Sequence, residues 1–357
     1  MNIRSSFQKD TQTLKTKPGS YEWWYFDAIS TDGYSVVIIF YDGNPFSRRY
    51  ISSLESEENA LAEQYPAISI SIYKDNRPVF YSFEEVEPVN ASFSSKKPAG
   101  NIGLSNFEGA QKGDGIEYKI ELNQTLLNGD SLKGTVIFDA ISVNLNESEL
   151  HLSTEHPNEM HEWNLVAPKC NVTGELFLDG YHKERIDFKG FGYHDHNRGD
   201  EPMRESFRQW YWGRYHLKNS TVVYYLMEEN GIWDEKAWIV EDDGKIRKMA
   251  DQIDKRDPEL SVFGLRCSRS ISLKDGDSEL FIQKERVLDS GPFYMRFFGK
   301  LIIRNGDQIE TAEGISEYIY PSRIHSRIFW PLVNMRIKYP GPPHWVQKSP
   351  VLYRWTW

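Results

Sequence analysis

FKGFGYHDHNRGDEPMRESFRQWYWGRYHL, residues 188–217, crowds imidazoles, carboxylates, an arginine and large aromatic side chains together without hydrophobic spacers. On a β-strand, alternate residues share a face. We therefore expect Tyr193, Asp195 and Asn197 to lie on one face of a strand, and His194 and His196 on the other. Asp195 would then sit beside a phenol and an amide.

The second half of this stretch also has strand periodicity. Trp210, Trp212 and Arg214 recur at alternate positions and predict an aromatic wall. A carboxyl group beside indole surfaces is disfavoured in its charged form, which makes Asp195 a candidate general acid. The alternative is that Asp195 caps a loop, a common role for Asp beside Asn and Gly.

Outside this stretch, short alternating segments are separated by Gly, Asn and Asp turns. The segment YEWWYFDAISTDGYSVVIIFYDG, residues 21–43, predicts two strands joined at Asp32-Gly33. The Trp23–Trp24 pair within it sends its indoles to opposite faces, so one of them packs in a core. The whole pattern predicts an all-β fold of two consecutive antiparallel barrels with few short helices. We expect a flexible lead-in at 1–18, a first barrel at 19–187, and a second barrel with a Pro-rich tail at 188–357.

Charge and composition exclude several classes of protein. The net charge of −10 and pI near 5.5 argue against nucleic acid as a partner. The chain has no long apolar run, and the first 20 residues lack the apolar segment of a signal peptide, which predicts a cytoplasmic location. Cys170 and Cys267 are too few for a disulfide framework and are expected to be buried thiols.

Two histidine pairings offer further chemistry. His161 and Trp163 in HEWNLVAP, residues 161–168, would share a strand face and could converge on the cavity that holds Asp195. His194 and His196 could instead be two metal ligands, with His161 or His182 as the third. Our preferred interpretation uses no metal and no cofactor.

The motif GYHDHNRGDEP, residues 192–202, followed by WYWGR, residues 210–214, resembles the central motif of carotenoid 1,2-hydratases, also called hydroxyneurosporene synthases. Three other motifs agree in order with that family: YEWWYFDA at 21–28, HEWNLVAP at 161–168, and GPFYMRF at 291–297 with the tail SRIHSRIFWPLVNMRIK at 322–338. The resemblance implies two lipocalin-like (calycin) β-barrels. The same superfamily contains pericyclases of the Diels–Alderase type, so the fold is implied more firmly than the reaction.

The resemblance also implies roles for individual residues. The family's catalytic His-x-Trp and Tyr-x-Asp pairs fall on His161, Trp163, Tyr193 and Asp195. Arg198 departs from the family pattern, which more often has Trp there. The aromatic and imidazole side chains that we expect to contact substrate are Trp210, Trp212, His194, Trp24 and Phe293.

The function that the resemblance implies is a cofactor-independent hydro-lyase. It would add water across the terminal C1–C2 double bond of an acyclic carotenoid such as neurosporene or lycopene, a long apolar polyene. A pericyclase and a non-catalytic carrier of apolar ligands remain open as alternatives. Because such a substrate lives in membranes, the basic and aromatic segment 323–338 is either an interfacial anchor on the inner face of a membrane or a packing element between domains.

Overall fold

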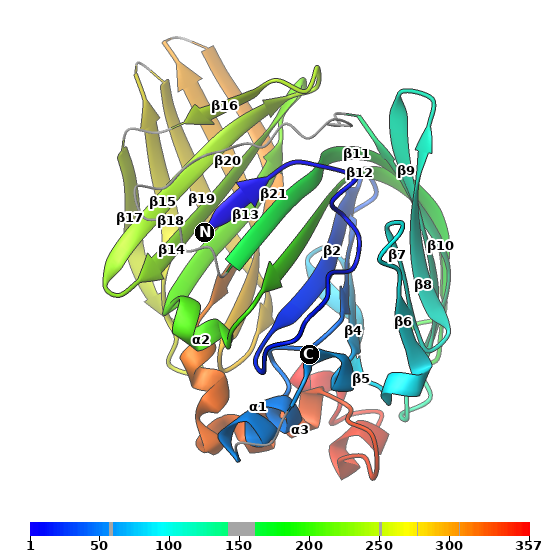
Figure 1. Ribbon diagram of the computed structural model, residues 1–357. Helices are drawn as coiled ribbons and strands as arrows, with labels where there is room; N and C mark the ends of the chain where they lie inside the picture. The colour runs from blue at the N-terminus through cyan, green and yellow to red at the C-terminus, as the bar shows by residue number, and fades with distance from the viewer. Residues whose placement is uncertain (57–59, 142–160, 250–251, 277, 307) are drawn as a thin grey trace. The chain divides into compact units, whose positions relative to one another are not determined.

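The computed structural model describes residues 1–56, 60–141, 161–249, 252–276, 278–306 and 308–357. The chain forms two compact units, and each contains one large sheet, antiparallel except where β1 joins the first (Figure 1). The first unit is made of Met1–Ser206 and Arg327–Trp357, and the second of Phe207–Ser326. The second unit is therefore inserted into the sequence of the first.

The sheet of the first unit has 12 strands, in the order β5-β4-β3-β2-β12-β11-β10-β9-β8-β7-β6, and β1 pairs with β11. Its strands are β1 (Asn2–Arg4), β2 (Tyr21–Ser30), β3 (Tyr34–Tyr41), β4 (Ala67–Lys74), β5 (Arg77–Glu85), β6 (Ala91–Phe93), β7 (Ala99–Ile102), β8 (Ser105–Lys112), β9 (Gly115–Thr125), β10 (Ser131–Ala140), β11 (His161–Asp179) and β12 (Glu184–Gly199). The helices of this unit are α1 (Arg48–Glu55), α2 (Met203–Ser206) and α3 (Trp330–Arg336), with short 3-10 turns η1 (Ala62–Gln64), η2 (Pro88–Asn90), η4 (Arg327–Phe329), η5 (Trp345–Lys348) and η6 (Arg354–Thr356).

The sheet of the second unit has nine strands, in the order β16-β15-β14-β13-β21-β20-β19-β18-β17. Its strands are β13 (Gln209–His216), β14 (Ser220–Glu229), β15 (Ile232–Glu241), β16 (Ile246–Met249), β17 (Gln252–Leu260), β18 (Arg266–Asp275), β19 (Ser278–Ser290), β20 (Tyr294–Asn305) and β21 (Gln308–Ile319), followed by η3 (Pro321–His325). Among the described residues, no helix has the length and apolar character needed to cross a bilayer.

Strand alternation explains how each curled sheet encloses a core. On β2, Trp24, Phe26 and Ala28 point to one face and join the main hydrophobic cluster of the first unit, while Trp23 does not belong to that cluster. The β2–β3 hairpin turns at Gly33, which has φ of +82°, a conformation that glycine adopts without steric cost. The predicted all-β fold, the hairpin and the divided Trp23–Trp24 pair are confirmed.

The domain boundaries differ from those expected. The expected division at 187/188 falls inside β12, whose residues pair with β11 and with β2 in a single sheet. Residues 1–18 are not a frayed lead-in: β1 pairs in parallel with β11, and Asp10 is fully buried. The C-terminal segment returns to the first unit, where Lys338 forms a bridge with Glu84 of β5. Polar residues at both ends of the chain find partners far away in sequence, which composition cannot reveal.

Candidate active site

Asp195 is held by three hydrogen-bond donors on one face of the first unit's sheet. The Trp163 indole N–H and the Tyr193 hydroxyl both donate to Oδ2 of Asp195, each at 2.7 Å. The Asn197 amide donates to Oδ1 at 2.9 Å. Because Trp163 on β11 pairs with Asn197 on β12, the indole lies on the same face as the alternating Tyr193, Asp195 and Asn197. Trp163 and Tyr193 are fully buried, and Asp195 is 3% exposed.

Strand β2 supplies more aromatic rings to the Asp195 face. The register places Trp23 opposite Asn197 and Tyr25 opposite Asp195. The ring of Tyr25 lies 6.2 Å from that of Tyr193, in an edge-on arrangement. The sequence motif contained these rings, but only the β2–β12 register shows that Trp23 and Tyr25, rather than Trp24, share a face with Asp195.

His161 lies at the end of the same face. Its Nδ1 is 2.9 Å from the hydroxyl of Tyr21, and its ring lies beside the rings of Tyr21 and Trp23, with centroids 5.9 and 6.2 Å away. Burial, followed by the positive charge of the amino terminus, lowers the pKa of His161 to about 3. The imidazole is therefore neutral at physiological pH and can accept a proton.

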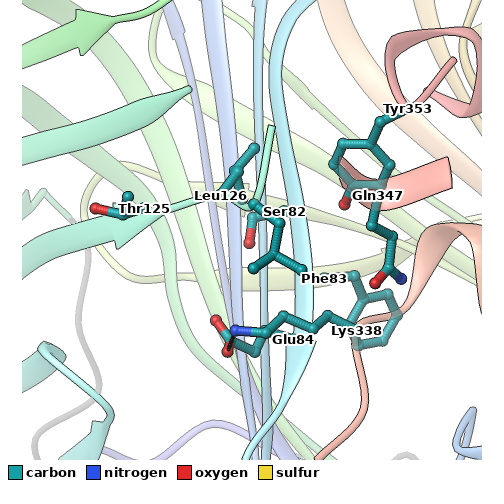
Figure 2. Close-up of a pocket in the computed structure, with 9 residues that line it drawn as sticks. Ser82, Phe83, Glu84, Thr125, Leu126, Lys338, Gln347 and Tyr353 are labelled. Carbon is teal, nitrogen blue, oxygen red and sulfur yellow. Dashed lines mark hydrogen bonds and ion pairs between the residues drawn. The ribbon is translucent and has the colours of Figure 1, made fainter. Parts of the chain in front are cut away.

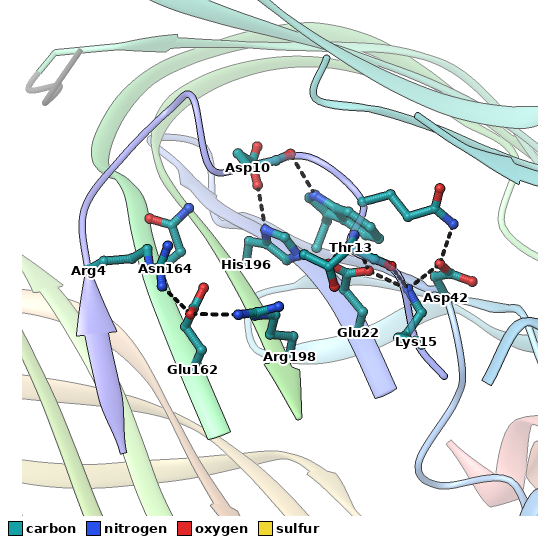
Figure 3. Close-up of polar contacts among 12 residues, drawn as sticks. Arg4, Asp10, Thr13, Lys15, Glu22, Asp42, Glu162, Asn164, His196 and Arg198 are labelled. Atoms are coloured by element: carbon teal, nitrogen blue, oxygen red, sulfur yellow. Dashed lines mark hydrogen bonds and ion pairs between the residues drawn. The ribbon is translucent and has the colours of Figure 1, made fainter. Parts of the chain in front are cut away.

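The reverse face of β12 carries a buried network of charged groups (Figure 3). Asp10 Oδ2 lies 3.0 Å from His194 Nε2, and Asp10 Oδ1 lies 3.2 Å from His196 Nδ1. His196 Nε2 lies 2.9 Å from Glu22 Oε1. His194 Nδ1 donates to the backbone carbonyl of Tyr25 at 2.9 Å, which fixes the ring against β2.

The N-terminal segment and β2 extend this network. Lys15 Nζ lies 2.5 Å from Glu22 Oε2 and 2.6 Å from Asp42 Oδ2. Burial alone would lower the pKa of His196, but hydrogen bonds and charges of Asp10 and Glu22 raise it to about 9. Burial would likewise raise the pKa of Asp10, but the charges and hydrogen bonds of the two histidines hold it below its usual value. His196 and Asp10 are therefore both charged at neutral pH.

The contacts of His194 and His196 bear on the alternative that these two histidines bind a metal ion. Within the described part of the chain, no group of three or more His, Cys, Asp or Glu side chains is placed to hold a metal ion. His194 and His196 contact Asp10 and Glu22, while His161 lies on the other face of the sheet. Sequence spacing gave the two histidines no carboxylate partner, because Asp10 and Glu22 are more than 170 residues away.

The residues expected to contact substrate lie in two different places, and none of the five is on the Asp195 face of β12. Trp24 and His194 lie in the core on the reverse side of β12: Trp24 stacks on His196 at 4.5 Å, and His194 stacks on Phe26 at 3.9 Å. Trp210, Trp212 and Phe293 belong to the second unit and are buried there. Arg198, which departs from the family pattern, pairs with Glu162 at 3.1 Å.

Two curled antiparallel sheets with few helices define a lipocalin-like, two-barrel class of protein. The solved structure of CghA with Sch210972 has this fold: its TM-score is 0.61 at 11% identity, covering 88% of this chain and 97% of that chain. This likeness concerns the fold.

The chain belongs to the carotenoid hydratase family, since the family model described as Carotenoid hydratase CrtC matches residues 90–346. It is 29% identical over 351 residues to a hydroxyneurosporene dehydrogenase of Chlorobaculum tepidum, covering 92% of this chain and 90% of that protein. It is 24% identical over 332 residues to an acyclic carotenoid 1,2-hydratase of Thiocapsa roseopersicina, covering 92% of this chain and 74% of that protein. The protein is thus an enzyme of the hydro-lyase type, and the resemblance seen in its motifs is confirmed.

Proposed function

We propose that the protein adds water across the terminal C1–C2 double bond of an acyclic carotenoid and that Asp195 is the proton donor. The observation that carries this proposal is the buried Asp195 carboxyl group with its three donors. The carboxyl group lies among aromatic rings, and the protein belongs to a family of carotenoid hydratases. A relative named acyclic carotenoid 1,2-hydratase supports the choice of substrate class.

Protonation of an isolated alkene requires an acid whose conjugate base is well stabilised. Oδ2 of Asp195 accepts hydrogen bonds from Trp163 and Tyr193, and Oδ1 accepts one from Asn197. The three donors stabilise the carboxylate that remains when the proton leaves, and they are already in place before the reaction. The proton goes to C2, and positive charge develops at C1.

The tertiary cation at C1 then needs stabilisation and a nucleophile. The π faces of Trp163 and Tyr193 would stabilise the cation by up to about 2 kcal/mol each in a dry site. Water attacks C1, and the oxonium ion that forms is a strong acid, so even a weakly basic imidazole can take its proton. Neutral His161, on the same sheet face, would take this role. The product is a tertiary alcohol, and solvent returns a proton to Asp195.

The test is incubation of the purified protein with lycopene or neurosporene in detergent, followed by mass spectrometry for the gain of one water. Asp195→Asn should lower the rate by about 10³-fold, because an amide offers no acidic proton. Tyr193→Phe removes one donor and should lower the rate roughly tenfold to a hundredfold.

Asp139→Asn, at an exposed position on β10, is the matched control and should retain full activity. Hydration retained by folded Asp195→Asn would exclude Asp195 as the acid, and a cyclised product that survives this substitution would favour a pericyclase.

A further inference from the structure

The segment 327–357 differs in composition from the rest of the chain. Its 31 residues include five Lys or Arg and no Asp or Glu, although the whole chain has a net charge of −10. Four of the 11 tryptophans of the protein also lie here. Lys and Arg combined with Trp are typical of segments that lie at the surface of a bilayer.

The last residues of this segment are anchored to two turns of the first unit. Arg354 pairs with Asp130, between β9 and β10, with Nη2 lying 2.5 Å from Oδ1. The guanidinium of Arg354 also lies 4.3 Å from the ring centre of Tyr181, between β11 and β12. The backbone N–H of Tyr181 donates to the same Asp130 carboxylate at 2.9 Å. These contacts hold the C-terminal segment and the two turns together at one end of the sheet.

Neighbouring contacts extend this assembly toward β9. Tyr353 and Gln347 line a small hollow together with Thr125, Leu126 and Leu127 at the end of that strand (Figure 2). Tyr353 is buried, and its hydroxyl donates to the carbonyl of Arg336 at 3.3 Å. Internal packing therefore fixes the position of the segment, and with it the backbone that carries the exposed side chains.

The outward side chains around Arg354 are apolar. We call them the C-terminal apolar patch: Leu127 (43% exposed), Tyr181 (70%), Val351 (60%), Leu352 (37%) and Trp355 (81%). Exposed apolar side chains gathered in this way mark interaction surfaces. The carboxylate of Asp130 beneath them is paired with Arg354. In the same segment Arg327 pairs with Glu55 at 3.2 Å, and Lys348 is exposed.

We propose that the C-terminal apolar patch docks on the surface of an anionic bilayer. The partner is chosen by charge: the segment contains no acidic residue and exposes Lys348, which complements anionic lipid headgroups. Its cations Arg327, Lys338 and Arg354 pair with carboxylates of the first unit. Exposed Trp, Leu and Val side chains supply the apolar contact that interfacial binding requires. The purpose of docking rests on the proposed function, because an acyclic carotenoid is dissolved in membranes and must be extracted from one.

The test measures sedimentation of the full-length protein with vesicles that contain no carotenoid. Wild type should bind vesicles of phosphatidylglycerol and phosphatidylcholine more tightly than vesicles of phosphatidylcholine alone, and added NaCl should weaken this binding. The double variant Val351→Ser with Leu352→Ser should bind about tenfold more weakly, because it loses two apolar side chains from the contact. The matched control, Val89→Ser with Leu104→Ser, changes the same residue types in the same unit at more exposed positions, 89% and 72%, and should bind like wild type.

Three results would overturn the proposal. One is a wild-type protein that does not bind anionic vesicles, and another is a control variant that weakens binding as much as the patch variant. The third is self-association of wild type that the patch variant abolishes without any vesicle binding, since the patch would then contact a second copy of the chain. Vesicle binding without hydration activity would leave the docking surface standing and would contradict the proposed function alone. With substrate embedded in vesicles, the patch variant should lose activity that it keeps in detergent.

Discussion

His161 and His196 are both buried histidines, yet the structure gives them opposite charge states. At His161, burial lowers the pKa to about 3, so the ring is neutral. At His196, burial acts in the same direction, but Asp10 and Glu22 raise the pKa to about 9 and the ring is charged. The two faces of β12 therefore differ in charge: neutral His161 lies on the face of Asp195, and the other face contains charged His196 with Asp10 and Glu22.

The neutral state of His161 makes the fold sensitive to acid. An unfolded histidine titrates near its usual pKa of 6.5, whereas folded His161 titrates near 3, so the unfolded state binds more protons between these values. The contribution of His161 to stability therefore falls as pH drops below about 6.5, by roughly 4 kcal/mol at pH 3. His161→Gln should reduce the slope of the unfolding free energy against pH, because up to one proton fewer is taken up on unfolding. Urea unfolding at several pH values between about 4 and 6 measures this slope. An unchanged slope would show that His161 is protonated in the folded protein.

The sequence predicted part of this site for a physical reason. Alternation along one strand is a local property, so the common face of Tyr193, Asp195 and Asn197 could be derived from spacing alone. His161 and Trp163 could be placed on one face in the same way. The charged state of His196 could not, because its partners Asp10 and Glu22 come from distant segments.

At the scale of elements, the N-terminal segment and β2 share one charge network. Lys15 lies between Glu22 of β2 and Asp42, which follows β3, and its side chain is 4% exposed. Burial would lower the pKa of Lys15, but these two carboxylates raise it, so the ammonium stays charged. The segment expected to be flexible is thus tied to the strands that support β12.

Removing this ammonium should destabilise the first unit. Lys15→Met keeps the length of the side chain but leaves Glu22 and Asp42 without their shared cation, which should cost about 3 kcal/mol or more in the free energy of unfolding. Urea unfolding followed by circular dichroism measures this loss. Lys17→Met, two residues along the same segment and exposed, is the control and should change stability by less than about 0.5 kcal/mol. Equal stability of the two variants would mean that the Lys15 pairs contribute nothing.

Strand periodicity also limited what could be predicted about boundaries. The period of two marks where strands run and which face each residue takes, but it does not say which strands pair. The expected division at 187/188 placed β12 from Phe188 onward in the second barrel, whereas its ladder with β2 keeps the whole strand in the first unit. The charged and aromatic stretch that drew attention to 188–217 spans the end of one unit and the beginning of the next.

At the scale of the whole molecule, the first unit is complete only with the segment 327–357. The backbone N–H of Lys338 donates to the Phe83 carbonyl at 2.9 Å, and the N–H of Glu85 donates to the Lys338 carbonyl at 2.8 Å. Val333, Val346 and Tyr353 bury apolar side chains in the same segment. The second unit has a hydrophobic cluster made entirely of residues 211–318 and does not include this segment.

A chain that ends at residue 326 should therefore lose stability in the first unit, although the missing residues follow the second unit in sequence. Each buried apolar side chain that is removed costs about 1.5–3 kcal/mol, so the first unit should lose several kcal/mol. Hydrogen exchange with mass spectrometry can measure the two units separately: peptides from β2 to β5 should exchange faster than in the full chain, and peptides from β18 to β21 should not. If the peptides of the second unit were the ones to exchange faster, the domains would be consecutive, with the C-terminal segment completing the second barrel.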